Sequence, residues 1–198
     1  MDIIELIKSR RSVRRFKAEA VGKDILLELV DAGRYAPSAA NRQPLEYIII
    51  TEPGICEKTF EQLAWAAYVQ PRRNPPAGKR PTAYIVILIN GEVELGDYGK
   101  VDAGAAIQNI LLAARAKGIG SCWIGSVQRE ALADILGVPG EYRIDSVIAL
   151  GFADEEPVAE DCTGDSIKYY LDEDDRLHVP KRPLKEVTHI GKFGDTAC

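Results

Sequence analysis

The chain has 198 residues, of which 46% are hydrophobic and 28% charged, which is typical of a globular protein that buries a core without metals or disulfides. Its 25 Lys and Arg against 30 Asp and Glu give a formal net charge of -5, so no basic field attracts nucleic acid or an anionic membrane. No apolar run reaches transmembrane length, and the acidic, amphipathic N-terminus is unlike a secretory signal. We therefore expect one cytoplasmic domain over residues 1–198, with neither nucleic acid nor membrane as a partner.

The cysteines and histidines form no recognisable metal or redox motif. Cys56, Cys122, Cys162 and Cys198 lie far apart without a C-x-x-C pair. Their even number is compatible with two disulfide bridges, but free thiols are favoured. Neither of the two histidines has the spacing of a structural zinc site. The sequence therefore predicts no bound metal.

The first part of the chain shows helical and strand patterns on either side of a loop between two prolines. Residues 23–35 carry apolar side chains at helical spacing, and Pro37 ends this helix because the residue before a proline is pushed out of the helical conformation. The elements expected here are a helix over 2–9, a basic segment over 10–16, a helix over 23–35, a loop over 37–44, a strand over 45–51 and a helix over 53–67.

The rest of the chain contains the most apolar helix. Residues 102–117 are almost entirely Ala, Ile and Leu, which predicts a central buried helix or an oligomer seam. The residues from 153 to 180 are acidic and polar, and they predict a loop followed by a small exposed hairpin. The expected elements are an irregular segment over 70–81, strands over 83–89, 121–124 and 143–150, a helix over 129–136, a loop over 153–165 and hairpin strands over 168–171 and 177–179. This alternation indicates an α/β or α+β sandwich with helices flanking one sheet.

Several common site motifs are absent or incomplete. No G-x-G-x-x-G follows a first strand, so a Rossmann dinucleotide site is not indicated. Residues 120–126 nearly match a phosphate-loop frame but lack its lysine and follow a helix rather than a strand. Gly164-Asp165-Ser166 lies in an acidic stretch with no catalytic histidine motif, which favours a plain turn over a hydrolase nucleophile.

A basic segment and a polar loop are the two positive signals. Arg10, Arg11, Ser12 and Arg14 supply guanidinium forks and a hydroxyl that suit a phosphate monoester. Taken alone, however, this composition favours a solvated basic face.

In the loop, Ser38, Asn41 and Gln43 lie between Pro37 and Pro44. The Asn and Gln amides could match the donor and acceptor edge of a flavin. A polar turn between a helix and a strand is an equally good interpretation of this loop.

Together the two signals form a more specific pattern. The order R-R-S-x-R-x-F at residues 10–16 and P-S-A-x-N-x-Q-P at residues 37–44 resembles the N-terminal signature of the nitroreductase family. The resemblance continues in order through most of the chain, at residues 102–114, 118–126, 148–152 and 181–187.

The resemblance implies an α+β fold: a three-layer α-β-α sandwich whose central, mostly antiparallel sheet is flanked by helices. It also implies an intertwined homodimer with FMN at the interface. Arg10, Arg11 and Ser12 would then hold the FMN phosphate, with Lys181 and Arg182, and Arg14 would lie near the pyrimidine end. The residues expected from the other subunit are Pro37, Ser38, Ala39, Asn41 and Gln43. The residues whose backbone would pass the flavin ring are Ile124, Gly125 and Ser126.

The implied activity is a ping-pong oxidoreductase reaction. NADH or NADPH would pass hydride to flavin N5, and an acceptor such as a nitroaromatic, a quinone or a flavin would then take the electrons. The cofactor carries this chemistry, so no protein general acid or base is assigned. A substrate-facing lid is expected around Trp65, Tyr68, Arg72 and Arg73. The basic residues from Arg72 to Arg80 are either a site for the nicotinamide cofactor's phosphates or, more in keeping with loop behaviour, a solvated loop.

Other functions stay open at this point. The chain could be a flavin-binding redox sensor or storage protein with little turnover, or a flavin-fragmenting or dehalogenating relative. An α/β domain that binds another phosphorylated ligand is a further alternative.

Overall fold

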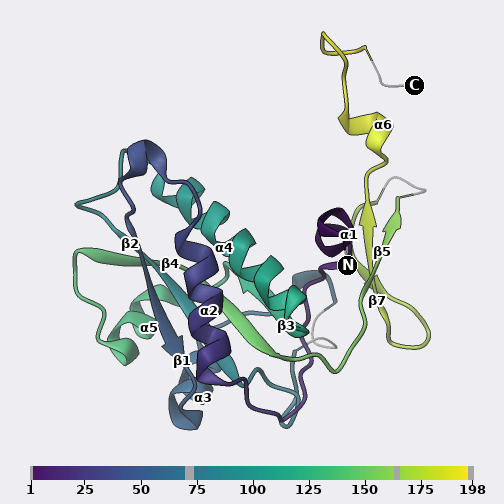
Figure 1. Cartoon of the computed structure of the whole chain (residues 1–198). Coiled ribbons are helices and arrows are strands. Elements are labelled where there is room, and N and C mark those ends of the chain that lie inside the picture. Colours follow the sequence, from purple (N-terminus) through teal and green to yellow (C-terminus); the bar gives the residue numbers. More distant parts are fainter. Residues whose placement is uncertain (1, 70–73, 163–165, 196–198) are drawn as a thin grey trace.

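The protein is built around a four-stranded antiparallel sheet in the order β1-β2-β4-β3 (Figure 1). The computed structural model describes residues 2–69, 74–162 and 166–195. The strands are β1 (Leu45–Ile50), β2 (Ala83–Asn90), β3 (Ile119–Ile124) and β4 (Tyr142–Phe152). β2 and the second half of β4, from Val147 to Leu150, are apolar and buried between helices on both faces, which explains the hydrophobic runs in these segments.

Helices cover both faces of this sheet and complete the expected three-layer sandwich. α2 (Lys23–Arg34) and α4 (Gly99–Ala116) pack on one face, and α3 (Pro53–Glu61) and α5 (Arg129–Leu136) pack on the other. α2 and α4 can cross closely because Gly33 has no side chain. A Cβ built at Gly33 would meet Ile110 at 2.8 Å.

Two of the expected helix boundaries differ from the structure. The helix predicted over 53–67 ends at Glu61, because the backbone that follows pairs with the segment before α5. The Ala64 N–H donates to the Ser126 carbonyl at 3.0 Å, and Leu63 forms a β-bridge with Val127. α4 begins at Gly99 rather than at Asp102, whose N–H already donates to the Tyr98 carbonyl.

The acidic C-terminal part forms a second, smaller sheet in the order β5-β7-β6. Its strands are β5 (Val158–Asp161), β6 (Tyr170–Leu171) and β7 (Leu177–Lys181). The predicted hairpin is present as β6 and β7. The loop predicted over 153–165 is wrong over β5, which pairs in parallel with β7. Parallel pairing joins segments far apart in the chain and leaves no turn signal in the sequence.

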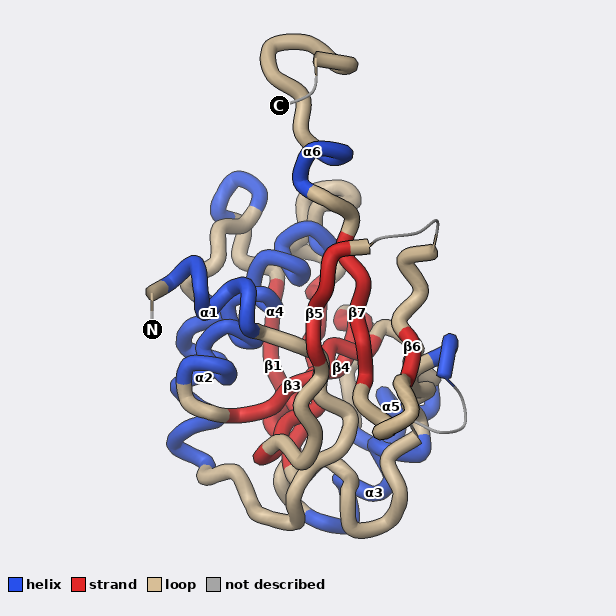
Figure 2. Tube along the Cα trace, turned by 90° about the vertical axis from the view of Figure 1, so that its right-hand side faces the viewer, coloured by secondary structure: helices blue, strands red, loops and turns tan. Residues whose placement is uncertain are grey.

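The small sheet lies on the β3 side of the main sheet, as the two views in Figures 1 and 2 show together. α1 (Ile3–Ser9) precedes the basic segment, and α6 (Leu184–Val187) follows β7. From α6 onward the chain extends away from both sheets (Figure 1). No helix in the described ranges combines the length and apolarity needed to cross a membrane.

Candidate functional site

The basic segment runs along the outer edge of β3. Val13 and Phe16 are buried, and the Val13 N–H donates to the Ser121 carbonyl at 2.9 Å. Phe16 packs so closely on β4 that a Cβ built at Gly151 would meet its ring at 2.8 Å. These two anchors hold the segment in place, and the polar residues Arg10, Arg11 and Arg14 line cavities on either side of Val13.

Several cations share the first cavity and its surroundings. The cavity has a volume of about 670 Å³ and is lined on one side by Arg10, Arg11, Arg115 and the start of β3. The residues from Ala153 to Pro157, which include three acidic side chains, also line it, as do Lys17 and Arg176. Burial lowers the pKa of Arg10. The pKa of Arg11 is lowered first by burial and then by the positive charges of Arg10 and Arg115. The arginines therefore face one another across a partly desolvated space.

Lys181 at the end of β7 joins this cluster from the small sheet. Its pKa is lowered by burial and then by the charges of Arg11 and Arg10. Within the described part of the chain, neither Lys181 nor Arg10 forms an ion pair. Arg10 and Arg11 are partly buried, while Lys181 and Arg115 are exposed. Neighbouring cations repel one another, and an anion bound between them removes that repulsion. We call Arg10, Arg11, Arg115 and Lys181 the cation cluster.

Two other residues predicted at the phosphate lie differently. Ser12 forms a β-bridge with Ser121 beside the cluster. Arg182 turns toward the start of α6, where its guanidinium donates to the Glu186 carbonyl at 3.0 Å. The geometry thus brings Arg10, Arg11 and Lys181 together and leaves Arg182 outside them.

A second cavity, of about 220 Å³, continues along β3. It is lined by Arg14, Cys122 and the predicted residues Ile124, Gly125 and Ser126, with residues 64–67 opposite. No atom lies within 4 Å of a Cβ built at Gly125, so a flat ring can approach this backbone closely.

Arg14 is held in place at the second cavity by contacts to two separate segments. Its N–H donates to Glu155 Oε1 at 2.5 Å, and its guanidinium lies 5.3 Å from the centre of the Tyr169 ring.

The polar loop lines a separate, third cavity of about 150 Å³, which shares no lining residue with the first two. Ala40, Asn41 and Gln43 adopt left-handed backbone conformations, with φ of 50°, 53° and 49°. Such conformations are strained for residues with a Cβ and need support from their surroundings.

Asp102 and Ser38 supply that support. Asp102 Oδ1 accepts from the Ala39 N–H at 3.0 Å, and Ser38 Oγ accepts from the Gln43 N–H at 3.0 Å. Pro37, Ser38 and Gln43 line the cavity, while the side chains of Asn41 and Gln43 are exposed.

The fold agrees with the comparisons to known proteins. The sequence model of the nitroreductase family matches residues 7–152. The chain belongs to the nitroreductase family.

Named relatives and solved structures of this family extend the likeness over most of the chain. A relative from Archaeoglobus fulgidus, provisionally named an NADH dehydrogenase/NAD(P)H nitroreductase, is 30% identical over 163 residues, which are 78% of this chain and 87% of its own. The NADPH-flavin oxidoreductase of Vibrio harveyi is 27% identical over 172 residues, 78% of this chain and 67% of its own. A crystal structure from Desulfovibrio desulfuricans, described provisionally as a nitroreductase in complex with FMN, has a TM-score of 0.73 at 25% identity and covers 98% of both chains.

Sequence reasoning missed three residues at the site of this nitroreductase-family chain. Glu155 lies in a stretch expected to be a plain acidic loop. Asp102 and Arg115 are charged residues of a helix that was interpreted only as a buried core or oligomer element because of its apolar composition. Their charge within an otherwise apolar helix was the signal that could have singled them out.

The expected lid lies only partly within the described residues. Trp65 is buried beside the second cavity, and Tyr68 is exposed. Arg72 and Arg73 lie outside the described residues. Lys79 and Arg80 were expected in a solvated loop or, as the less favoured alternative, at a site for nicotinamide phosphates. They form ion pairs with Asp154 and Glu57.

The cysteines and possible metal ligands add no further site to this family member. Cys56, Cys122 and Cys162 are free thiols, and Cys198 is outside the described residues. Burial raises the pKa of Cys56 to about 11 and also raises that of Cys122, so both are protonated at neutral pH. No group of His, Cys, Asp and Glu within residues 2–69, 74–162 and 166–195 is arranged to hold a metal ion.

Proposed function

We propose that this protein is an FMN-dependent oxidoreductase that uses NADH or NADPH as the electron donor and works as a homodimer. The acceptor class we propose is that of nitroaromatics, quinones and flavins. Family membership supports this, as does the FMN complex of the Desulfovibrio desulfuricans relative. The names of the Archaeoglobus fulgidus and Vibrio harveyi relatives support the nicotinamide donor.

The cation cluster is the observation that carries the proposal. FMN has a doubly charged phosphate at one end and a flat ring system at the other. The cluster offers unpaired cations, and the neighbouring cavity along β3 offers the open backbone of Gly125. The residues present therefore fit FMN, with its phosphate toward Arg10, Arg11 and Lys181 and its ring toward Ile124, Gly125 and Ser126.

The protein residues have the tasks of binding and charge compensation. Arg10, Arg11 and Lys181 would bind the phosphate, which relieves their mutual repulsion. Arg14 would supply a positive charge beside the ring that favours its anionic, reduced form. Bound FMN supplies a reversible two-electron carrier, so no side chain of the protein has to take part in covalent chemistry.

The polar loop fits the FMN site of a partner subunit. Its cavity shares no residue with those along β3, yet the side-chain amides of Asn41 and Gln43 are exposed and can reach a neighbouring molecule. α4 and β3 also expose apolar side chains, including Val101 and Trp123, which a second copy of the chain can cover. We therefore propose that Ser38, Asn41 and Gln43 complete the partner's site.

An absorbance spectrum with FMN and anaerobic titration with NADH and NADPH test the proposal. A flavin spectrum that bleaches with one donor, and recovers with a nitroaromatic or quinone, is the expected result. A bound flavin that neither donor reduces would contradict the oxidoreductase activity and favour a redox sensor. A protein that does not bind FMN at all would overturn the whole assignment.

Subunit complementation tests the shared site. The double variant Arg10→Ala/Arg11→Ala and the variant Asn41→Ala should each bind FMN weakly as homodimers. Refolding the two together should restore one intact site per mixed dimer, because both defects then fall on the other site. No recovery of FMN binding in mixed dimers would place Asn41 in the same subunit's site or outside it.

A further inference from the structure

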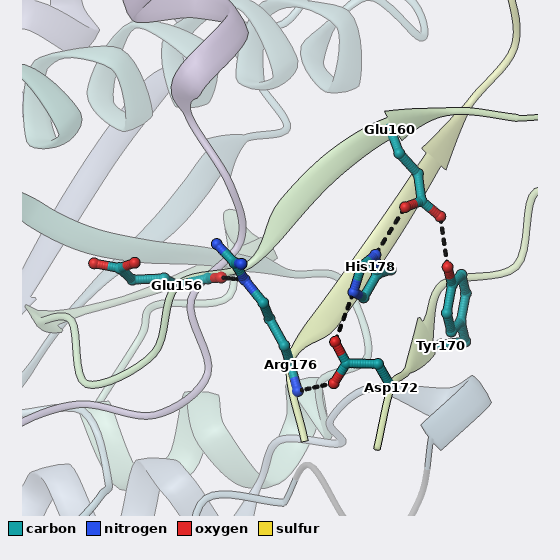
Figure 3. A network of polar contacts seen from close by, with 6 residues as sticks. All are labelled: Glu156, Glu160, Tyr170, Asp172, Arg176 and His178. Carbon is teal, nitrogen blue, oxygen red and sulfur yellow. Dashed lines mark hydrogen bonds and ion pairs between the residues drawn. The ribbon is translucent and has the colours of Figure 1, made fainter. Parts of the chain in front are cut away.

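His178 in β7 lies in a polar network that the proposed reaction does not use (Figure 3). Its ring Nδ1 is 2.7 Å from Glu160 Oε2 of β5, and its Nε2 is 2.9 Å from Asp172 Oδ2 just after β6. The Tyr170 ring stacks on it at 4.9 Å between centroids, and the Tyr170 hydroxyl donates to the other oxygen of Glu160. One imidazole therefore joins all three strands of the small sheet.

This geometry requires a protonated ring. A neutral imidazole carries a hydrogen on only one nitrogen, so its other nitrogen would face a carboxylate oxygen with lone pair against lone pair. With both nitrogens protonated, each donates to one carboxylate. In agreement with this, Glu160 and then Asp172 raise the pKa of His178.

The small sheet also contributes to the candidate site. Side chains alternate along a strand, so His178 and Lys181 lie on opposite faces of β7. Leu177 is buried, and Lys181 reaches the cation cluster, where Arg10 and Arg11 repel it. β7 therefore has to hold Lys181 against a repulsive field whenever no anion is bound.

Further side-chain contacts tie the small sheet to the rest of the protein, among them the Tyr169 hydroxyl, which accepts from the Tyr68 N–H at 3.3 Å. Arg15 pairs with Asp175 at 2.7 Å in the turn between β6 and β7, and the Arg176 guanidinium donates to the Glu156 carbonyl at 3.1 Å. Arg14 lies over Tyr169, just before β6. These contacts are polar or partly exposed, and none of them joins β5 to β6. The imidazole and the Tyr170 hydroxyl both connect Glu160 of β5 to the β6 side of the sheet. The charged or titratable groups that face the imidazole are Glu160, Asp172 and Tyr170.

We propose that His178 is a positioning residue: its protonated ring clamps Glu160 to Asp172, fixes β7, and so holds Lys181 where it completes the site for the phosphate. The proposal rests on the proposed function, because the anion is taken to be the FMN phosphate. Loss of the proton at higher pH opens the clamp and weakens the grip of Lys181. Binding of the phosphorylated cofactor thereby becomes sensitive to pH through a residue that does not touch it.

Dissociation constants of FMN from the apoprotein, measured by fluorescence at pH 7 and pH 9, test this. Above pH 7 a phosphate monoester keeps almost its full charge, so the ligand changes little over this range. At pH 7, His178→Gln should weaken FMN binding about threefold to tenfold relative to the unmodified protein. At pH 9 the unmodified protein should approach the value of this variant.

Three controls separate the clamp from a general structural effect. His178→Arg, whose charge pH 9 does not remove, should keep the tighter binding at both pH values. Riboflavin lacks the phosphate, so its affinity should not change in any of these variants. In a Lys181→Met background, His178→Gln should have no further effect on FMN binding, because the residue through which it acts is gone.

Each of these readouts can also overturn the proposal. Equal FMN affinity of the unmodified protein and His178→Gln at pH 7 would do so, as would an equal loss of riboflavin binding. If the unmodified protein binds no FMN, the proposed function fails, and hydrogen exchange of the β7 amides then decides about the clamp. β7 should lose protection between pH 7 and pH 9 in the unmodified protein but not in His178→Arg, after correction for intrinsic rates; equal behaviour of the two would refute the clamp.

Discussion

The two sheets of this protein are held together by different forces. At the centre of the main sheet, β2 and the second half of β4 are apolar and buried on both faces, and the apolar sides of helices cover them. The small sheet is held by an imidazole between two carboxylates, by ion pairs and by ring contacts. Burial of neutral side chains does not depend on proton or salt concentration, whereas exposed charge pairs do. The main sheet is therefore a constant scaffold, and the small sheet is the part that conditions can adjust.

Truncating a core side chain in each sheet should show the largest difference. Ile148 in β4 is fully buried, and Ile148→Ala should lower the free energy of unfolding by about 2–5 kcal/mol. Val179 in β7 is only partly buried, so Val179→Ala should cost well under that. Urea unfolding measures the change in the free energy of unfolding for both variants. Equal decreases would show that apolar burial stabilises the small sheet as much as the main sheet.

Variants of the cation cluster compare the two sheets at the candidate site, because Arg10, Arg11 and Arg115 belong to the part of the protein around the main sheet and Lys181 belongs to the small sheet. Arg10→Ala/Arg11→Ala should weaken FMN binding by at least about 100-fold, since it removes two charge-assisted contacts that contribute roughly 1.5–3 kcal/mol each. The apoprotein should remain folded, because the buried Val13 and Phe16 still anchor the segment. Fluorescence titration with FMN and a far-UV spectrum measure the two effects.

Asp102 tests the support of the polar loop from the main body. Asp102→Ala removes the acceptor of the Ala39 N–H and leaves the left-handed residues unsupported. The partly buried Ala39 N–H then loses its partner, at a cost of roughly 1–3 kcal/mol in the native loop conformation. FMN binding should weaken about tenfold, because less of the protein holds the loop in that conformation. Asp102→Asn keeps an acceptor oxygen and should lie between Asp102→Ala and the unmodified protein. Equal FMN binding by Asp102→Ala, Asp102→Asn and the unmodified protein would show that the polar loop does not contribute to the FMN site.

Lys181 tests the contribution of the small sheet to the same site. Lys181→Met should weaken FMN binding about threefold to tenfold, which is less than the loss at the two arginines. The apoprotein should become slightly more stable, because a lysine whose pKa is lowered by burial and by Arg11 and Arg10 is charged at a cost in the folded state. Thermal unfolding without and with FMN should therefore show shifts of opposite sign.

The smallest expected effect is a two-sided pH dependence of the small sheet alone. The pKa of His178 is raised, so its contribution is complete below its ordinary pKa and is lost as pH rises through the folded-state value. The pKa values of Glu160, lowered chiefly by His178, and Asp172, lowered first by the Arg176 N–H, act in the opposite sense. Their contributions are lost as pH falls through the folded-state values.

Hydrogen exchange should accordingly show greatest protection of β5, β6 and β7 between these two limits, and 0.5 M salt should flatten the profile. The central strands β2 and β4 should show no such maximum. A shared profile would mean that the two sheets open together, and it would remove the distinction between scaffold and adjustable part.

The main sheet could be predicted closely from the sequence because its signals are local. Runs of Ile, Val and Leu identify the strands. Pro37 marks the end of the preceding helix, because the residue before a proline is pushed out of the helical conformation. The errors fall where distant segments pair. The helix predicted beyond Glu61 stops because Leu63 meets Val127, and β5 exists because it pairs with β7.

The sequence by itself determined the family, the order of the main elements and the candidate residues Arg10, Arg11, Ser38 and Gly125, because motifs and hydrophobic periods are properties of neighbouring residues. The tertiary structure decided which charges meet. Only the fold brings Lys181 to Arg10 and turns Arg182 toward Glu186. The electrostatic energy of two charges depends on the distance between them and on their burial. For residues far apart in the chain, the local sequence determines neither quantity.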